Sequence, residues 1–246
     1  MTDIRELILY RNFENGKVLE DMTWIMEHFK EKECSEEVRE RFFSCMHELI
    51  ELAAQYGFEQ NLWQTYLTFL LVNNENSFST ACEIRGISDC SLLNLARHDF
   101  VIFRELFAYD FTDLERTLQA GFFEELLCYR REETSGKLFN HRIRDRICSL
   151  SKELAAADTL EGFTENMVEF YREFGVGTLG LHKAFRVAHD ESGVRIEPIT
   201  NIRHVNLEDL VGYEIAKQKL IDNTEAFVQG RRANNCLLFG DAGTGK

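Results

Sequence analysis

A single proline among 246 residues is the feature that most restricts the fold of this chain. It is Pro198, so residues 1–197 lack the residue that most effectively ends a helix. The alternation of apolar and polar residues that is typical of strands is also scarce there. The sequence therefore predicts a bundle or an array of helices over most of the chain.

Apolar periodicity locates the individual helices. The clearest one runs from residue 35 to about residue 56, where Ser35 can cap the first turn and apolar residues recur every three or four positions. Residues 61–71 are apolar nearly all round, which favours a central helix. Helices are also expected over residues 92–107, 144–156 and 160–174.

Thr112 and Glu115 match a capping box and predict the start of another helix. We expect this helix to extend through Phe122, Phe123, Leu126 and Leu127 and to pack inward. The only concentration of basic residues follows it and comprises Arg130, Arg131, Arg142, Arg144 and Arg146. These arginines could contact phosphate or a partner's acids, but acidic neighbours favour a solvated helix face.

Composition limits the possible partners and compartments. The formal net charge is −14, and residues 1–160 hold 29 acidic against 18 basic residues, a net of −11. This acidic part argues against direct nucleic-acid binding. No apolar run is long enough for a membrane span and no basic signal peptide begins the chain, so we expect a soluble cytoplasmic protein.

Cysteines and histidines give no sign of a metal or catalytic site. The seven cysteines lie at positions 34, 45, 82, 90, 128, 148 and 236, and none form a C-x-x-C pair. We expect reduced thiols that fill the core rather than disulfides or zinc ligands. The seven histidines are scattered, and none is predicted to be catalytic.

The composition and residue pattern of the sequence change at residue 175. Three glycines in residues 175–180 favour a flexible hinge, and the stretches 184–188 and 194–199 flank a turn in a pattern typical of a β-hairpin. A helix over about residues 213–228 follows, and Gly230 is expected to end it. We predict a helical domain over residues 1–174, a linker with the hairpin over 175–203, and the start of an α/β domain over 204–246.

The last residues carry the strongest functional signal. A buried strand is expected over residues 235–239, and G-D-A-G-T-G-K after it matches the phosphate-binding pattern G-x-x-x-x-G-K. The glycines let the backbone approach a phosphate, its amides would surround the anion, and the lysine adds a positive charge. The predicted nucleotide-binding residues are Gly240, Asp241, Ala242, Gly243, Thr244, Gly245 and Lys246.

These residues together resemble the opening of an AAA+ ATPase module. Asp209-Leu210-Val211-Gly212, the expected helix, the turn at 230–234, the strand and the glycine loop follow in that module's order. Residues 212–214, 223–227 and 234–235 and the loop are most similar to a bacterial family of predicted AAA+ ATPases of unknown cellular role. The resemblance covers residues 175–246 well, and the preceding helices share only its general character.

The resemblance implies a site and its cofactors. Val211 and Gly212 would lie against adenine with Tyr213 nearby, and the full-length protein would use ATP and Mg²⁺. Asp241 stands where the wider superfamily commonly has proline. The resemblance also implies a homo-oligomer, because a neighbour's arginine commonly completes such a site.

Two interpretations of the function remain open. The serine or threonine that binds magnesium, the acidic strand, the sensors and the arginine finger are not in this sequence, so no catalytic or metal-binding residue is expected in it. We hypothesise a truncated ATPase that binds nucleotide weakly or not at all by itself, and whose helical part recognises a protein partner that the ATP cycle remodels or regulates. The alternative is a non-catalytic helical interaction module with a nucleotide-sensing loop.

Overall fold

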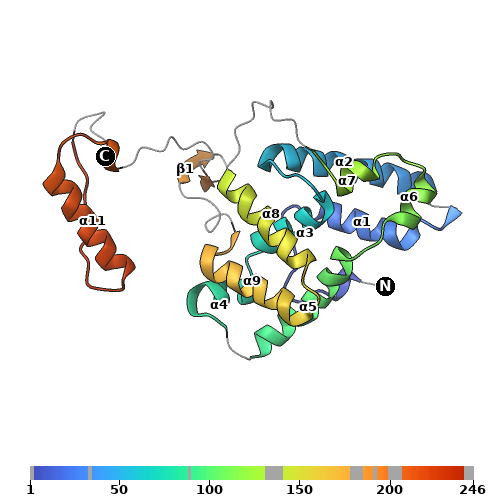
Figure 1. Ribbon diagram of the computed structural model, residues 1–246, viewed down its shortest axis with the longest axis horizontal. Coiled ribbons are helices and arrows are strands. Elements are labelled where there is room, and N and C mark those ends of the chain that lie inside the picture. The colour runs from blue at the N-terminus through green and yellow to red at the C-terminus, as the bar shows by residue number, and fades with distance from the viewer. Residues whose placement is uncertain are drawn as a thin grey trace. The chain divides into compact units, whose positions relative to one another are not determined.

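The computed structural model describes residues 3–32, 35–87, 90–130, 141–177, 185–190, 193–198 and 207–240 (Figure 1). Contacts divide the chain into two compact units, Met1–Asn201 and Ile202–Lys246. The first unit is helical and ends in a two-stranded antiparallel sheet, as the sequence predicts. The described part of the second unit holds a short 3₁₀ helix and one α-helix.

The first unit contains the following elements in chain order. They are η1 (Ile4–Glu6), α1 (Lys17–His28), α2 (Ser35–Tyr56), α3 (Leu62–Asn73), α4 (Ser77–Arg85), α5 (Ser91–Phe107), α6 (Thr112–Leu118), α7 (Phe123–Leu127), α8 (His141–Ala155), α9 (Leu160–Phe174), β1 (Phe185–Asp190) and β2 (Gly193–Pro198). The helices expected over 35–56, 61–71, 92–107, 144–156 and 160–174 are confirmed, with ends within about three residues.

Helix α3 is the centre of the first unit. Ten of its twelve residues are buried, and it contacts α2, α5, α7 and α8. Its two largest side chains also bond to neighbouring segments. The Trp63 Nε1 donates to the carbonyl of Leu106 at 2.9 Å, and the Tyr66 hydroxyl donates to the carbonyl of Asn15 at 2.6 Å. Helix α3 is apolar nearly all round because other elements pack around it.

A buried carboxylate holds the N-terminal segment against α5. Asp99 is fully buried and accepts three backbone N–H groups, from Ile8 at 2.9 Å, Leu9 at 2.7 Å and Tyr10 at 2.9 Å. Three donors compensate for the removal of the charge from water. These bonds join residues about ninety positions apart, so they set the position of the chain before α1.

A second buried polar contact links the N-terminal segment to α9. The hydroxyls of Tyr10 and Tyr171 lie 3.0 Å apart, and Tyr171 also donates to the carbonyl of Leu71 at 2.7 Å. Burial raises the pKa of both phenols. This pair stays protonated and ties α3 to both ends of the helical unit.

The expected long helix after residue 112 is wrong in two respects. The helix begins at Thr112, but its N-cap is Phe111 and forms no side-chain cap bond; Asp110 instead accepts from the Thr112 backbone N–H at 2.9 Å. The chain then breaks at Gln119, which adopts a left-handed conformation at φ 50°, and resumes as α7. Because of this break Phe122 is 52% exposed, whereas Phe123 is buried.

The β-hairpin is confirmed. Strand β1 pairs with β2 in antiparallel register, with Val187 opposite Ile196 and His189 opposite Val194. This register places Val187, Ile196 and Val194 on one face of the sheet, because alternate residues share a face. Each of the three is more than 60% exposed.

Two further expectations are only partly met. Residues 175–177 are not a free hinge, because Gly175 ends α9 with an N–H bond to the carbonyl of Tyr171 and Val176 is buried; residues 178–180 lie outside the described part. Cys45 and Cys82 are buried free thiols as expected, but Cys128 and Cys236 are exposed. Within the described residues, no helix is long and apolar enough to cross a membrane.

Candidate functional site

The segment that leads to the glycine loop contains η3 (Leu207–Asp209) and α11 (Glu214–Val228). Lys217 joins the two elements. Its Nζ donates to the carbonyl of Leu210 at 2.8 Å and lies 2.9 Å from a carboxylate oxygen of Glu214. The Lys217 side chain is only 16% exposed, so it is held between these partners and stabilises the entry to the helix.

The three residues expected to contact adenine lie directly before α11. Val211 is 95% exposed and Tyr213 is 70% exposed. Tyr213 is the N-cap of α11 and adopts a left-handed conformation at φ 60°, while Gly212 has φ 88°, which favours glycine. The described residues place the three beside one another along the chain but do not enclose them in a pocket.

A tight turn reverses the chain after α11, and Gly230 ends the helix as predicted. The Gly230 N–H donates to the carbonyl of Phe227 at 3.0 Å, and the Arg231 N–H donates to the carbonyl of Ala226 at 2.8 Å. This pair of bonds, with Gly230 at φ 68°, is a Schellman motif. The turn sends the following residues back along the helix.

Asn223 holds the returning chain against α11. Its side-chain amide donates to the carbonyl of Asn234 at 2.8 Å, and its Oδ1 accepts from the Asn234 N–H at 2.8 Å. The Asn223 side chain thus acts like a neighbouring backbone unit and satisfies both polar groups of Asn234. The bonds set the distance from α11 to the residues that enter the glycine loop.

The expected buried strand at residues 235–239 is wrong for the described structure. These residues form no strand, and Leu237 and Phe239 are 83% and 87% exposed. A strand needs a neighbour for its backbone hydrogen bonds, and the described part of residues 207–240 offers none. The segment is apolar and irregular, and its large side chains are exposed, whereas those of the helical unit are largely buried.

The predicted phosphate-binding residues fall mostly outside the described part. Gly240 is the last described residue and is exposed, and residues 241–246 lie beyond it. The structure therefore describes the approach to the loop and not the loop. The described residues also contain no group of three or more His, Cys, Asp or Glu side chains that could hold a metal ion.

The arginine concentration lies partly on α8 and has structural partners. Arg144 pairs with Asp145 at 2.6 Å, and the Arg146 guanidinium lies 3.9 Å from the ring centroid of Phe174. Burial lowers the pKa of Arg146, and the neighbouring Arg142 adds to the effect. These contacts favour the interpretation as a helix face over a phosphate site, while Arg131 lies outside the described residues.

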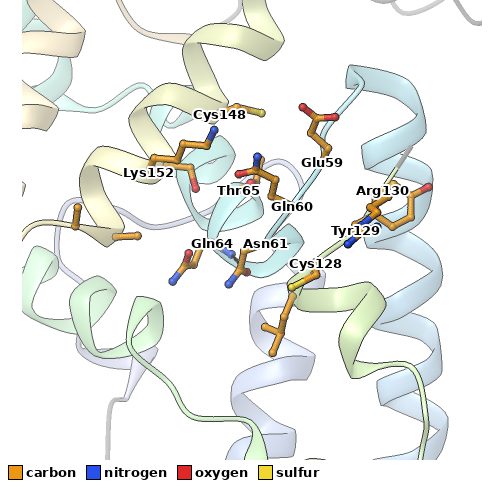
Figure 2. A pocket seen from close by; sticks show the side chains of 14 residues that line it. Glu59, Gln60, Asn61, Gln64, Thr65, Cys128, Tyr129, Arg130, Cys148 and Lys152 are labelled. Carbon is orange, nitrogen blue, oxygen red and sulfur yellow. Dashed lines mark hydrogen bonds between the residues drawn. The ribbon is translucent and has the colours of Figure 1, made fainter. Parts of the chain in front are cut away.

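The helical unit also contains a pocket, lined by both polar and apolar side chains, that no sequence pattern predicted. The pocket has a volume of about 830 Å³ and lies between the start of α3, the residues after α7, and α8 (Figure 2). An isolated β-bridge between Gln60 and Tyr129 forms one wall, with backbone bonds of 2.7 and 2.9 Å. The residues come from three distant segments, so no local pattern could have indicated the pocket.

Comparison with known proteins places part of the chain near one family. Residues 180–246 match a family described as "Protein of unknown function (DUF815)". This match covers the hairpin, α11 and the glycine loop. No curated protein matches the chain. No solved structure matches it either.

Proposed function

We propose that residues 204–246 are the opening of an ATP-binding AAA+ module. In this proposal the helical residues 1–174 recognise or regulate a protein partner, and ATP binding and hydrolysis in the complete module act on that partner. ATP and Mg²⁺ are the proposed cofactors, and a homo-oligomer is the proposed active form.

The order of elements before the glycine loop is the observation that carries the proposal. Helix α11, the Schellman turn at Gly230 and an apolar segment held by Asn223 lead directly into G-x-x-x-x-G-K. The phosphate loop of a nucleotide-binding domain needs a strand immediately before it and a helix after it. The match to residues 180–246 spans the same elements, although its description assigns no function.

The exposed apolar side chains support an incomplete sheet. Leu237, Leu238 and Phe239 are each more than half exposed, and so are Ile215, Phe227 and Val228 on α11. A central parallel strand is covered on both faces, and its apolar residues leave water only when neighbouring strands and helices are present. In the proposed module, further strands pair with residues 235–239 and cover these side chains.

The proposed roles follow from the chemistry of the loop. Backbone amides of residues 240–245 would bind the phosphate oxygens, and Lys246 would place its ammonium group against the β- and γ-phosphates. Val211, Gly212 and Tyr213 would lie against the adenine. In the proposed complete module, residues that are not in this sequence would supply the magnesium ligand, the acidic strand and the arginine finger.

A titration of the complete gene product with magnesium-ATP tests the proposal. We expect Lys246→Ala to weaken ATP binding by about tenfold to a hundredfold, because it removes a charge-assisted contact to phosphate. Lys219→Ala, on the exposed surface of α11, is the matched control and should leave binding unchanged. Equal affinity in the wild type and the Lys246 variant would overturn the proposal.

Phosphate release from the same protein separates the two functional interpretations. Turnover that depends on Mg²⁺ supports the ATPase. Nucleotide binding without turnover supports the non-catalytic interaction module, in which the loop only senses nucleotide.

A further inference from the structure

The pocket of the helical unit combines unpaired polar groups from separate elements. Figure 2 shows Lys152 and Cys148 on α8, Arg130 and Tyr129 on the opposite side of the pocket, and Thr65 of α3 between them. The volume of about 830 Å³ lies within the range of small-molecule sites. The walls belong to the same compact unit, so the pocket is part of its fold.

Two nearly buried residues line this pocket, and neither of their hydroxyls has a hydrogen-bond partner among the described residues. Thr65 is 3% exposed and Ser151 is 5% exposed, and both line the pocket. Other threonines on these helices behave differently: Thr68 donates to the carbonyl of Gln64 at 2.9 Å and Thr164 donates to that of Leu160 at 2.7 Å. Thr65 and Ser151 therefore offer their hydrogen bonds to whatever occupies the pocket.

The charges around the pocket favour an anion at its centre. Lys152 and Arg130 line it, and neither forms an ion pair with another residue that the structure describes. Glu59 lines the rim and is likewise without an ion pair within the described ranges. Two cations against one carboxylate give a positive site in a helical region whose overall charge is negative.

The backbone adds to this positive potential. Helix α3 has twelve residues and begins at the pocket, where Asn61 caps it by accepting from the Gln64 N–H at 3.0 Å. Its first turn holds no acidic side chain, so the positive end of the helix dipole is not neutralised there. Burial raises the pKa of the Cys148 thiol, so this group stays neutral beside the anion.

We propose that this pocket binds a small oxyanion metabolite, a carboxylate or a phosphate that also carries a hydrogen-bond donor. Lys152 and Arg130 neutralise the anionic group, and the hydroxyls of Thr65 and Ser151 donate to its oxygens. Glu59 accepts from the donor at the other end of the ligand and selects against ligands that are only anionic. The site is separate from the proposed nucleotide loop and does not depend on it.

Inorganic phosphate and succinate are the two probes, because they distinguish a phosphate ligand from a carboxylate ligand. Each is titrated into the 246-residue protein while backbone amide signals are followed by NMR. We expect at least one probe to bind with a dissociation constant of about a millimolar or tighter and to shift the amide signals of residues 61–65 and 151–152. The probe that binds more tightly identifies the anion class. No shift in these residues with either probe overturns the proposal.

Two substitutions with opposite expected effects sharpen the test. Lys152→Ala should weaken binding of the effective probe by about tenfold, because one charge-assisted hydrogen bond is lost. Glu59→Gln should strengthen binding of the same simple anion by about threefold, because a repulsive charge is removed. Lys219→Ala is the control and should change nothing. Identical affinities in all four proteins contradict the assignment.

Thr65→Val separates a binding role from a structural one. The two side chains have nearly the same shape, and the Thr65 hydroxyl bonds to no described residue. The variant should therefore keep the wild-type melting temperature while it binds the probe at least about threefold more weakly. A lower melting temperature with unchanged binding would show that the hydroxyl has a structural partner and would overturn its assigned role. Because magnesium-ATP binding to the gene product should be unaffected by Thr65→Val, this result is independent of the nucleotide proposal.

Discussion

Helices α3 and α11 have apolar residues along much of their length, yet their surroundings differ completely. Ten of the twelve residues of α3 are buried, whereas none of the fifteen residues of α11 is buried. Phe69 on α3 is 2% exposed and Phe227 on α11 is 74% exposed. The comparison shows that apolar side chains in a helix indicate a surface that needs packing partners. The side chains become buried only where other elements pack against that surface.

A matched pair of phenylalanine substitutions gives the largest expected effect. Phe100 is fully buried, with ring centroids 5.4 Å from Tyr10 and 5.4 Å from Phe163. Phe100→Ala should lower the free energy of unfolding by about 3–5 kcal/mol because it leaves a cavity. Phe227→Ala should change it by less than about 0.5 kcal/mol. Urea unfolding followed by circular dichroism measures both, and similar losses would remove the distinction between the packed helices of the first unit, such as α5 with Phe100, and the exposed helix α11.

The buried carboxylate of the helical unit predicts the next largest effect. Asp99→Asn places an NH₂ group against backbone N–H donors of Ile8, Leu9 or Tyr10, and should cost about 2–3 kcal/mol. Asp113→Asn is the control, because that side chain is 58% exposed and its ion pairs contribute about 0.5 kcal/mol or less. If both variants unfold at the same urea concentration, Asp99 does not anchor the N-terminal segment.

A buried thiol predicts a pH dependence of the helical unit. Burial raises the pKa of Cys45 from 9.0 to about 12. The unfolded chain then releases this proton at a lower pH than the folded chain. The contribution to stability is complete below about pH 9 and is lost as the pH rises toward about 12, at a slope of about 1.4 kcal/mol per pH unit.

Cys45→Ser removes this proton release and should flatten the loss of stability between pH 9 and 11 relative to the wild type. Unfolding curves at several pH values measure how the free energy of unfolding changes with pH. The other ionising groups contribute equally in both proteins, so the difference between the two slopes reports on Cys45. Equal slopes in the two proteins would mean that the pKa of Cys45 is the same in the folded and the unfolded chain.

The smallest expected effect concerns the exposed C-terminal unit. Asn223→Ala removes two hydrogen bonds to Asn234 and should raise the exchange rate of the Asn234 amide by about tenfold, equivalent to about 1.4 kcal/mol of local stability. Gln218→Ala on the same helix is the control, since among the described residues the Gln218 side chain bonds to Asp222 and not to the returning chain. Equal exchange in both variants would show that the turn at Gly230 alone positions the returning chain.

The sequence predicted what depends on local periodicity and local turn chemistry. Helix α2 begins and ends where the apolar spacing indicates, α9 spans residues 160–174, and Gly230 ends α11 with the expected left-handed conformation. The hairpin was predictable from alternation on both sides of a polar turn. In each case neighbouring residues contain the physical cause.

Long-range contacts could not be predicted in the same way. The bonds from Asp99 to the N-terminal segment cross about ninety residues, and the bridge from Gln60 to Tyr129 crosses nearly seventy. The break at Gln119 is a left-handed conformation in a residue that rarely adopts one, so no glycine marked it. The pocket depends on such contacts, which is why no local sequence pattern indicated it.

The candidate nucleotide site is the reverse case, because its motif can be recognised in the sequence but the structure around it cannot. Its motif is continuous in sequence and was found directly, but Val211 and Tyr213 lie exposed and residues 241–246 are outside the described part. A phosphate loop is recognisable without its surroundings, whereas a strand at residues 235–239 requires neighbouring strands. The motif was therefore easier to predict than the structure that precedes it.

Amide hydrogen exchange of the 246-residue protein tests the contrast between the two regions most directly. We predict slow exchange across residues 65–72 of α3, whose amides are buried and bonded, and fast exchange at residues 237–239, whose side chains are exposed and whose backbone forms no strand. Protection at residues 237–239 comparable to that of α3 would contradict the account, because it would show that this segment is already paired and covered.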